Sequence, residues 1–271
     1  MPGDITVILR VNPSLSRNVH KNFSNYGKGK LFLSSIRSLK ENLDGLDYSV
    51  SLIIDYSDVN DFMYIKNLAD TVFNSYDLIE SYSSEKYGIK RNRNTFKLQL
   101  LRALKSTSKY ILLAEDDYIY IKPFYKIIDL LENYEEIDYV TPYDHPDYYN
   151  SKWHSNYEKK EYKIHDETFR TVSSTTLTFL ARRDSLIEDL DIFMLYANSR
   201  LMDYEIWLLL TRLAKTSLNL KRTMLLWLYK ILKNLRRKKR RILVAPYSTF
   251  AVHIAEGGIP DYISVTTLQL L

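Results

Sequence analysis

The sequence predicts an α/β fold of three layers, in which helices cover both faces of a mixed, mostly parallel central sheet. Short apolar runs alternate with stretches of helical spacing through the first half of the chain, as expected for strands and helices of a covered sheet. The run Tyr110 to Ala114 shows no polar alternation, which indicates a strand buried on both faces. With 45% hydrophobic residues and only 7 Gly and 7 Pro, the 271-residue chain has material for a core, and the disordered and fibrous classes are excluded.

The elements of the first half follow from spacing. Leu31, Ser35, Leu39 and Leu43 recur at helical intervals, and Phe96, Leu100 and Leu104 share one face of another helix. In chain order we expect a strand at 5–9, a helix at 31–43, a strand at 48–55, a helix at 62–73, a short strand at 77–80, a helix at 95–104 and the strand that ends at Glu115.

The second half is less regular and carries no internal repeat or clear linker. Pro123 suits the first turn of a helix that runs to about residue 133, and Ser185 and Glu188 have the spacing of a capping box for a helix through Tyr196. The remaining expected elements are a strand at 139–141, a Pro- and Tyr-rich loop at 142–153, a strand at 171–180 and a helix that begins near Asp203.

Three consecutive acidic residues, Glu115, Asp116 and Asp117, end the buried strand. Parallel sheets bind ligands at the carboxyl ends of their strands, and three adjacent carboxylates repel one another unless a cation lies among them. Mg2+ and Mn2+ prefer carboxylate oxygens and also bridge phosphates, so the cluster predicts a metal-diphosphate site. An acidic surface turn is the alternative. The chain has no Cys, which excludes disulfides, thiolate ligands and a Cys nucleophile.

Cations precede the acidic cluster by one helix. Lys90, Arg91 and Arg93 suit phosphate binding because a guanidinium group holds phosphate in a bidentate manner, and a solvated loop is the alternative. Asn94 suits either a contact to the same ligand or a cap for the helix that follows.

At this point the residues resemble a known family. The segment Gly88 to Asp117, above all Arg93 and Asn94 followed by a helix, a strand and the acidic cluster, resembles the nucleotide-sugar half of a GT-A-fold glycosyltransferase, similar to the inverting family 2. The segment Asp203-Tyr204-Glu205-Ile206-Trp207 is similar to that family's Glu-Asp-x-acidic-aliphatic-Trp segment, although Met202 stands where the family commonly has Glu. The matches run in the family's order over about residues 1–260.

The resemblance implies a metal-dependent, inverting glycosyltransferase that moves a sugar from a nucleotide-sugar donor to a hydroxyl acceptor. It implies a domain at 1–217, with a donor half at about 1–120 and an acceptor half at about 121–217, completed by residues 244–271. Asp203 is the implied catalytic base, with Glu205 as the alternative. Mn2+ or Mg2+ is the implied cofactor, held by Asp117 and His253. The expected donor-binding residues are Arg91, Arg93, Asn94, Glu115 and Asp116.

Two of these assignments have structural alternatives. Asp203 lies where a helix begins, so it also suits a helix cap. His253 lies in an apolar stretch, which is typical of a hydrogen-bonded core histidine. The aromatic-rich loop from Tyr143 to Trp153 suits an acceptor site, a loop metal site at Asp144, His145 and Asp147, or an ordinary surface loop.

Residues 218–243 form a predicted basic amphipathic insertion, in which an apolar run with Trp227 and Tyr229 precedes the basic cluster Arg236 to Arg241. The run is shorter than the about 20 residues that cross a bilayer, but its aromatic and basic residues suit an anionic membrane surface. The alternatives are a core helix with a solvated basic loop, or nucleic-acid binding, for which no recognisable motif is present.

The apolar run and the basic cluster also allow a second interpretation of the whole chain. In this interpretation the protein is a non-catalytic membrane- or nucleic-acid-associated binding protein with an enzyme-like fold. The start, Met1 to Leu9, does not resemble a signal peptide. The expected location is therefore the cytoplasm, or the cytoplasmic face of a membrane if the insertion binds lipid.

Overall fold

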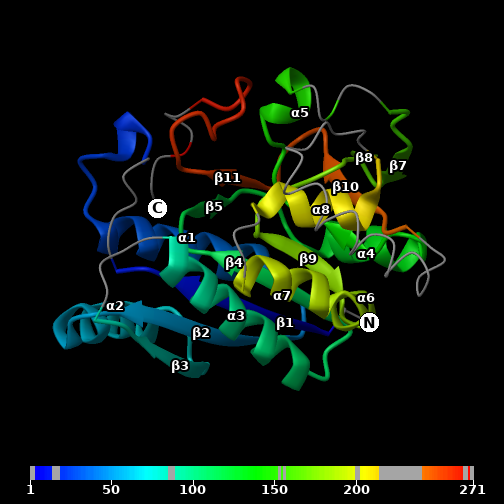
Figure 1. Ribbon diagram of the computed structural model, residues 1–271. Coiled ribbons are helices and arrows are strands. Elements are labelled where there is room, and N and C mark those ends of the chain that lie inside the picture. The colour runs from blue at the N-terminus through cyan, green and yellow to red at the C-terminus, as the bar shows by residue number, and fades with distance from the viewer. Residues whose placement is uncertain are drawn as a thin grey trace.

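A mixed sheet forms the centre of the protein, as the computed structural model shows (Figure 1). The structure describes residues 4–13, 19–84, 89–151, 154, 157–198, 202–213, 240–264 and 268. Within them the sheet has nine strands, in the order β3-β2-β1-β4-β9-β6-β10-β8-β7, and β5 and β11 form a separate pair.

The first half alternates strands and helices as predicted. It comprises β1 (Ile5–Val11), α1 (Lys28–Asn42), β2 (Tyr48–Tyr56), α2 (Val59–Asp70), β3 (Asp77–Tyr82), α3 (Ile89–Lys105) and β4 (Tyr110–Glu115). The second half comprises β5 (Tyr118–Tyr120), α4 (Tyr125–Asn133), β6 (Tyr139–Val140), α5 (Asp147–Asn150), β7 (Glu161–Ile164), β8 (Glu167–Thr171), β9 (Phe179–Arg182), α6 (Arg183–Glu188), α7 (Leu190–Asn198), α8 (Asp203–Thr211), β10 (Leu243–Pro246) and β11 (Ala251–His253).

Most strands of the sheet run in one direction. β1 is parallel to β2 and β4, and β3 is parallel to β2. β9 is antiparallel to both β4 and β6, so β6 runs with β4, and β10 runs with β6. Within the described nine-stranded sheet, only β8 and β9 are reversed. The predicted fold class is confirmed.

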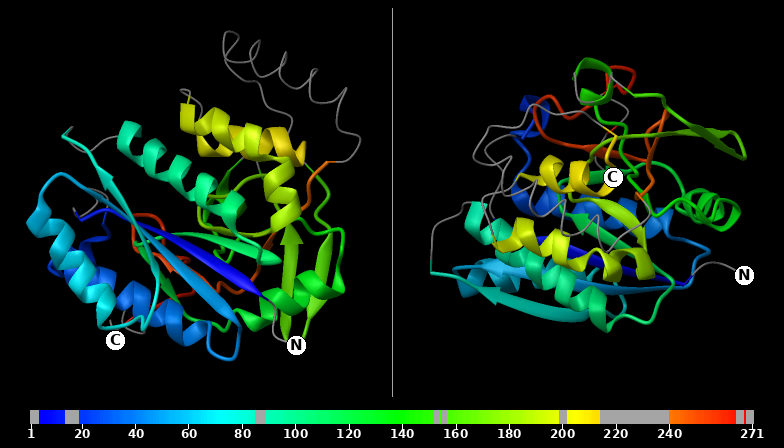
Figure 2. Two further views of the ribbon diagram at one scale, coloured as in Figure 1. Left: turned by 90° about the horizontal axis from the view of Figure 1, so that it is seen from below. Right: turned by 45° about the vertical axis from the view of Figure 1, so that its right-hand side comes forward.

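Two hydrophobic cores lie on opposite faces of the sheet. Val7 and Leu9 of β1 pack on one face with residues of α1, α2 and α4, and Ile8 packs on the other with residues of α3, α7 and α8. Figure 2 shows these two helical layers with the sheet between them. Because successive strand residues point to opposite faces, a strand covered on both sides needs apolar residues at every position, and this explains the unbroken apolar runs.

The predicted strand at 171–180 is wrong. β8 ends at Thr171 and β9 begins at Phe179, and a buried loop joins them. Side chains of α8 bond to the backbone of this loop: Trp207 Nε1 donates to the Thr176 carbonyl, and Thr211 Oγ1 donates to the Ser173 carbonyl. These bonds replace part of a strand ladder, so a buried segment rich in Ser and Thr does not need to be a strand.

Two predicted helix starts are also corrected. α3 begins at Ile89, so Asn94 lies inside the helix and does not cap it. α6 begins at Arg183, and the Ser185 hydroxyl donates to Asp138 Oδ1 instead of forming a capping box. Glu188 pairs with Arg241.

Most of the predicted insertion, residues 218–239, lies outside the described residues. The last residues of the insertion, 240–243, are among the described residues, and Arg241 stabilises the fold. Arg241 lies 2.9 Å from Asp138 Oδ1 and 2.7 Å from Asp189 Oδ2, and both aspartates are buried. Among the described helices none is long and apolar enough to span a membrane.

Candidate functional site

Each carboxylate of the acidic cluster, Glu115, Asp116 and Asp117, is paired with a basic side chain. Glu115 ends β4, and its Oε1 lies 2.5 Å from Arg10. Asp116 Oδ2 lies 2.5 Å from Lys28 Nζ, and Asp117 Oδ2 lies 3.1 Å from His253 Nε2. The three basic side chains come from β1, α1 and β11, so the site is assembled from distant parts of the chain.

Arg10 reaches Glu115 because the two residues are direct neighbours across parallel strands β1 and β4. Arg10 also donates to the Asn92 carbonyl at 2.9 Å and to the Asn92 side chain, which links the sheet to the first turns of α3. Thr178 Oγ1 donates to the other oxygen of Glu115 at 3.3 Å. Glu115 is therefore hydrogen-bonded at both oxygens.

Asp116 is nearly buried, with 7% of its surface exposed. Its Oδ2 accepts the Asn12 backbone N–H at 3.0 Å in addition to its contact with Lys28. Lys28 is the first residue of α1. This contact therefore ties the start of α1 to the end of β4.

Asp117 and His253 meet because β5 and β11 pair in an antiparallel ladder (Figure 1). In this register His253 lies opposite Tyr118, and the two rings stack with centroids 4.7 Å apart. The Ile254 N–H donates to the Asp117 carbonyl at 3.0 Å, which fixes the backbone on both sides. The sequence resemblance placed these two residues together, and the ladder shows how a separation of 136 positions is closed.

A tight turn follows His253. Gly257 has a φ of +71°, a left-handed conformation that glycine adopts without strain. A Cβ atom at Gly258 would lie 2.9 Å from the His253 carbonyl oxygen and 3.2 Å from its Nδ1. The paired glycines thus close the turn against His253.

The pairing shifts the pKa values of these side chains. Burial raises the pKa of Asp117, but the charge and hydrogen bond of His253, aided by Lys28 and Arg10, outweigh burial and lower it to about 2. Burial lowers the pKa of His253, but Asp117 and Glu115 raise it above its usual value. For Glu115 and Asp116, burial outweighs the partner cation and raises each pKa.

Asp117 and His253 are suitable protein ligands for a divalent cation. Asp117 Oδ1 is buried and has no hydrogen-bond partner among the described residues, and a carboxylate with an imidazole suits Mn2+. The described residues contain no group of three or more His, Cys, Asp or Glu side chains that could hold a metal ion. Glu115 and Asp116 are already bonded to Arg10 and Lys28, so further ligands would have to come from substrate or water.

The predicted donor-binding residues of α3 differ in burial and in their contacts. Arg91 is buried and forms two hydrogen bonds of 2.9 Å with Asp55 at the end of β2, so its guanidinium group stabilises the fold. Arg93 lies over the ring of Tyr196, 5.3 Å from its centroid. Lys90 and Asn94 are exposed.

Tyr196 of α7 packs against α3, where its ring lies 5.4 Å from that of Phe96. Burial raises the pKa of Tyr196, and the charges that also act on its hydroxyl come from Arg10, Glu115, Asp203 and Arg93. The charges of the predicted base and of Glu115 therefore both act on this hydroxyl.

The two candidate bases differ in their surroundings. Asp203 is the first residue of α8 and partly exposed, and its Oδ1 accepts the Tyr204 N–H at 2.8 Å. Burial raises the pKa of Asp203, against the opposing hydrogen bonds of nearby backbone N–H groups. Glu205 is 1% exposed, and its Oε2 accepts the Met202 N–H at 2.6 Å. Glu205, not Asp203, therefore closes the start of the helix.

The loop at 143–151 borders the site, although the loop metal site is not formed. Asp144 and Arg170 are fully buried and lie 2.7 Å apart, and the hydroxyls of Tyr149 and Tyr262 both donate to Asp144 Oδ2 at 2.9 Å. Asp144 is therefore a structural anchor for the loop. The ring of His145 lies 5.0 Å from that of Tyr143, whose own ring lies 6.2 Å from that of His253.

A second histidine near this loop, His154, is structural. It is 3% exposed, and its Nδ1 lies 3.1 Å from Ser173 Oγ while its Nε2 lies 3.3 Å from Ser174 Oγ. Burial lowers its pKa to about 4. The ring is therefore neutral at neutral pH.

We expect His154 to make the protein less stable in mild acid. Between pH 6.5 and pH 4 the unfolded chain binds a proton that the native state does not, so the free energy of unfolding falls as pH falls through this window, by up to about 3 kcal/mol. Urea unfolding at pH 7 and pH 4.5 should show a smaller loss for His154→Gln than for wild type. The control is His165→Asn at an exposed, left-handed residue that Asn tolerates. Equal losses in wild type and His154→Gln would contradict the assignment.

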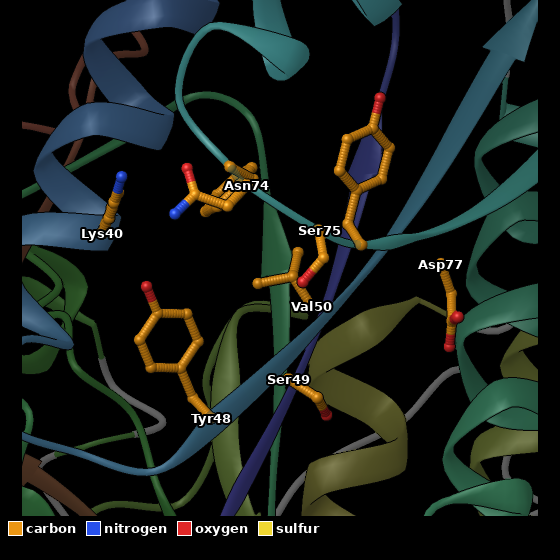
Figure 3. Close-up of a pocket in the computed structure, with 9 residues that line it drawn as sticks. Lys40, Tyr48, Ser49, Val50, Asn74, Ser75 and Asp77 are labelled. Atoms are coloured by element: carbon orange, nitrogen blue, oxygen red, sulfur yellow. The ribbon is translucent and has the colours of Figure 1, made fainter.

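A polar hollow of about 410 Å³ lies at the other end of the sheet. Figure 3 shows Tyr48 of β2 on one side of it, with Asn74 and Ser75 from the segment before β3. Tyr48 and Asp77 are the first residues of their strands, so the hollow lies at the amino ends. It therefore belongs to the edge of the sheet opposite the acidic cluster.

Comparison with solved structures found similar folds at low sequence identity. Two structures of S. aureus TarS 1–349, one of them in complex with UDP, align with TM-scores of 0.43 and 0.45 at 14% and 12% identity. Each alignment covers 76% of this chain and 54% of the TarS chain, so the protein spans about half the length of these matches. The mannosyltransferase PcManGT from Pyrobaculum calidifontis, in complex with GDP-Man and Mn2+, aligns with a TM-score of 0.49 at 11% identity, over 89% of this chain and 66% of that one.

These similarities concern the fold alone. No protein-family model matches the chain, and no curated protein matches it.

Sequence reasoning missed two cations of this site, Arg10 and Lys28. Arg10 had a signal, because a charged residue inside an apolar strand needs a buried partner. No signal in the sequence indicated Lys28, since a lysine at the start of an amphipathic helix is usually solvated. Thr178 was assigned to a strand and not to the site, although it bonds to Glu115.

Proposed function

We propose that this protein is a glycosyltransferase that moves a sugar from a nucleotide-sugar donor to a hydroxyl acceptor, with Mn2+ or Mg2+ at the donor diphosphate. The observation that carries the proposal is the pair of Asp117 and His253 at the carboxyl end of the parallel strands, where a buried carboxylate oxygen has no partner among the described residues. This is the edge at which open α/β sheets bind ligands.

The donor side would stabilise the leaving diphosphate. Asp117 and His253 hold the cation, which when bound neutralises charge that develops on the diphosphate. Arg93, which lies over the ring of Tyr196, and the exposed Lys90 are the α3 cations proposed to contact phosphate, and Asn94 stays a candidate contact on the same helix. Glu115 and Asp116 set the charge of the donor site together with their partner cations. Arg91 supports the site indirectly through Asp55.

The acceptor side would supply a base, as an inverting transfer requires. Asp203 takes the proton of the acceptor hydroxyl as the new bond to the sugar forms. Its raised pKa supports this role, because a carboxylate with a pKa closer to neutrality is a stronger base. Glu205 is occupied by the helix start, which favours Asp203. His145 and Tyr149 lie on the loop whose Tyr143 ring contacts that of His253.

A thermal-shift screen tests the proposal. Nucleotide sugars, including UDP- and GDP-linked ones, are added with Mn2+ or with a chelator. A donor at 100 times its Kd stabilises the native state by about 2.7 kcal/mol, which for a chain of this size raises Tm by roughly 5–10 °C. A panel without any Mn2+-dependent shift would contradict the proposal. Donor binding without transfer or hydrolysis would favour a non-catalytic binding protein.

The acceptor in this proposal is linked to a lipid or held at a membrane, and the support is the composition of residues 218–240. An aromatic and apolar run beside a basic cluster suits an anionic surface. Arg241 is excluded from the membrane-binding cluster because it is bonded to buried carboxylates.

We expect the protein to bind anionic vesicles at low salt and to lose at least tenfold in affinity when residues 236–240 are replaced by Ser, since each basic residue near such a surface contributes about 1 kcal/mol. Sedimentation with vesicles that contain phosphatidylserine measures this, and neutral vesicles are the control. Arg241→Ser should instead lower Tm, because it leaves Asp138 and Asp189 without their cation. Binding that the Ser variant retains would contradict the membrane assignment.

A further inference from the structure

Lys28 is the least expected member of the site. Its Nζ lies 2.5 Å from Asp116 Oδ2, and the two side chains are 13% and 9% exposed. An ion pair so largely removed from water is little screened by salt. Lys30, two residues along the same helix, is exposed and lies over the ring of Tyr26 at 4.3 Å.

Lys28 forms an ion pair with Asp116, a carboxylate that would otherwise attract a free metal ion. Asp116 Oδ2 is bonded to Lys28 and to the Asn12 N–H, and Glu115 is bonded to Arg10 and Thr178. Two of the three acidic residues are thus balanced by a cation of the chain itself. The cluster therefore attracts a free divalent cation much less than three bare carboxylates would.

We propose that Lys28 is a built-in counter-ion that prevents free divalent cations from binding the acidic cluster, so that the metal is taken up only together with the nucleoside diphosphate. The inference rests on the proposed function, because it places the diphosphate at Asp117 and His253. A diphosphate brings further oxygen ligands and negative charge, and Mg2+ sites of this kind use few carboxylates plus substrate phosphates. Lys28 thereby selects the metal-nucleotide complex over the free metal.

The experiment measures Mn2+ binding by electron paramagnetic resonance, in which protein-bound Mn2+ loses the signal of the free aqueous ion. Wild type, Lys28→Met and the matched control Lys30→Met are titrated with Mn2+ alone, and then with Mn2+ plus UDP or GDP. Met keeps an unbranched apolar side chain and removes the ammonium group, with both its charge and its N–H donors. We expect Lys28→Met to bind Mn2+ alone at least tenfold more tightly than wild type, which corresponds to about 1.4 kcal/mol. Lys30→Met should match wild type.

A double substitution assigns the effect to Asp116. Adding Asp116→Asn to Lys28→Met should remove the gain, because the uncovered carboxylate is then absent. Circular dichroism checks that each variant folds, and Lys28→Gln serves as a second neutral variant.

Two outcomes would overturn the inference. One is that Lys28→Met and Lys28→Gln, both folded, gain no affinity for Mn2+ alone. The other is that wild type takes up Mn2+ without a nucleotide, and as tightly as with one. A gain in Lys28→Met, combined with no Mn2+ uptake by wild type in the presence of either diphosphate, would overturn the proposed donor site and not the shielding by Lys28.

Discussion

Asp203→Asn should lower turnover by at least about a hundredfold while donor binding and folding stay normal, because a positioned general base contributes typically 10²–10⁴-fold. Asn cannot take the acceptor proton, but it can still accept the Tyr204 N–H that Asp203 Oδ1 accepts. The expected stability cost is at most about 1 kcal/mol, the usual effect of one charge at a helix N-terminus. Steady-state kinetics with a donor identified by the thermal screen, together with urea unfolding, separates the two effects.

Asp191 provides a matched control. It lies in the first turn of α7, and its Oδ1 accepts the N–H of the next residue at 2.9 Å, as Asp203 does in α8. Asp191→Asn should therefore leave turnover unchanged. Glu205→Gln should keep most of its bond to Met202 and leave turnover nearly normal. If Asp203→Asn retained wild-type turnover and Glu205→Gln did not, the base would be Glu205.

Asp117→Asn should abolish metal-dependent donor binding in a protein that still folds. Removal of one carboxylate charge weakens a hard cation directly. Even the outer hydrogen-bond partners of metal sites cost about 10–100-fold in metal affinity when mutated, so loss of a direct ligand should exceed that range. Calorimetric titration of a nucleotide sugar, with and without Mn2+, measures the change.

The control for this variant is Asp184→Asn, which removes an aspartate charge at a side chain that is 93% exposed. It should bind the donor as wild type does. His253→Ala should weaken Mn2+-dependent binding in the same direction as Asp117→Asn. Unchanged Mn2+-dependent binding of every donor by Asp117→Asn would remove Asp117 from the site.

The misplaced elements share a cause. The segment at 171–180 has the composition of a strand, but its carbonyl groups are bonded by Trp207 and Thr211 of α8. Ser185 and Glu188 have the spacing of a cap, but Asp138 and Arg241 hold them. In each case the residues are bonded by partners distant in sequence, and local patterns carry no information about such partners.

The sequence by itself determined the layers of the fold and the location of the acidic cluster. Unbroken apolar runs such as that of β4 require a sheet covered on both faces, and Glu115, Asp116 and Asp117 follow such a strand directly. These properties are local, because they depend on the period of the hydrophobic residues and on where a run ends.

Only the tertiary structure decided the charge of that cluster. Arg10 and Glu115 are 105 positions apart, and Asp117 and His253 are 136 apart. Strand register and helix packing bring them together, and hydrophobic periodicity specifies which face of a strand is buried but not which charged residue lies beside it. For this reason Lys28 gave no signal in the sequence, although its contact with Asp116 sets how strongly the site attracts a cation.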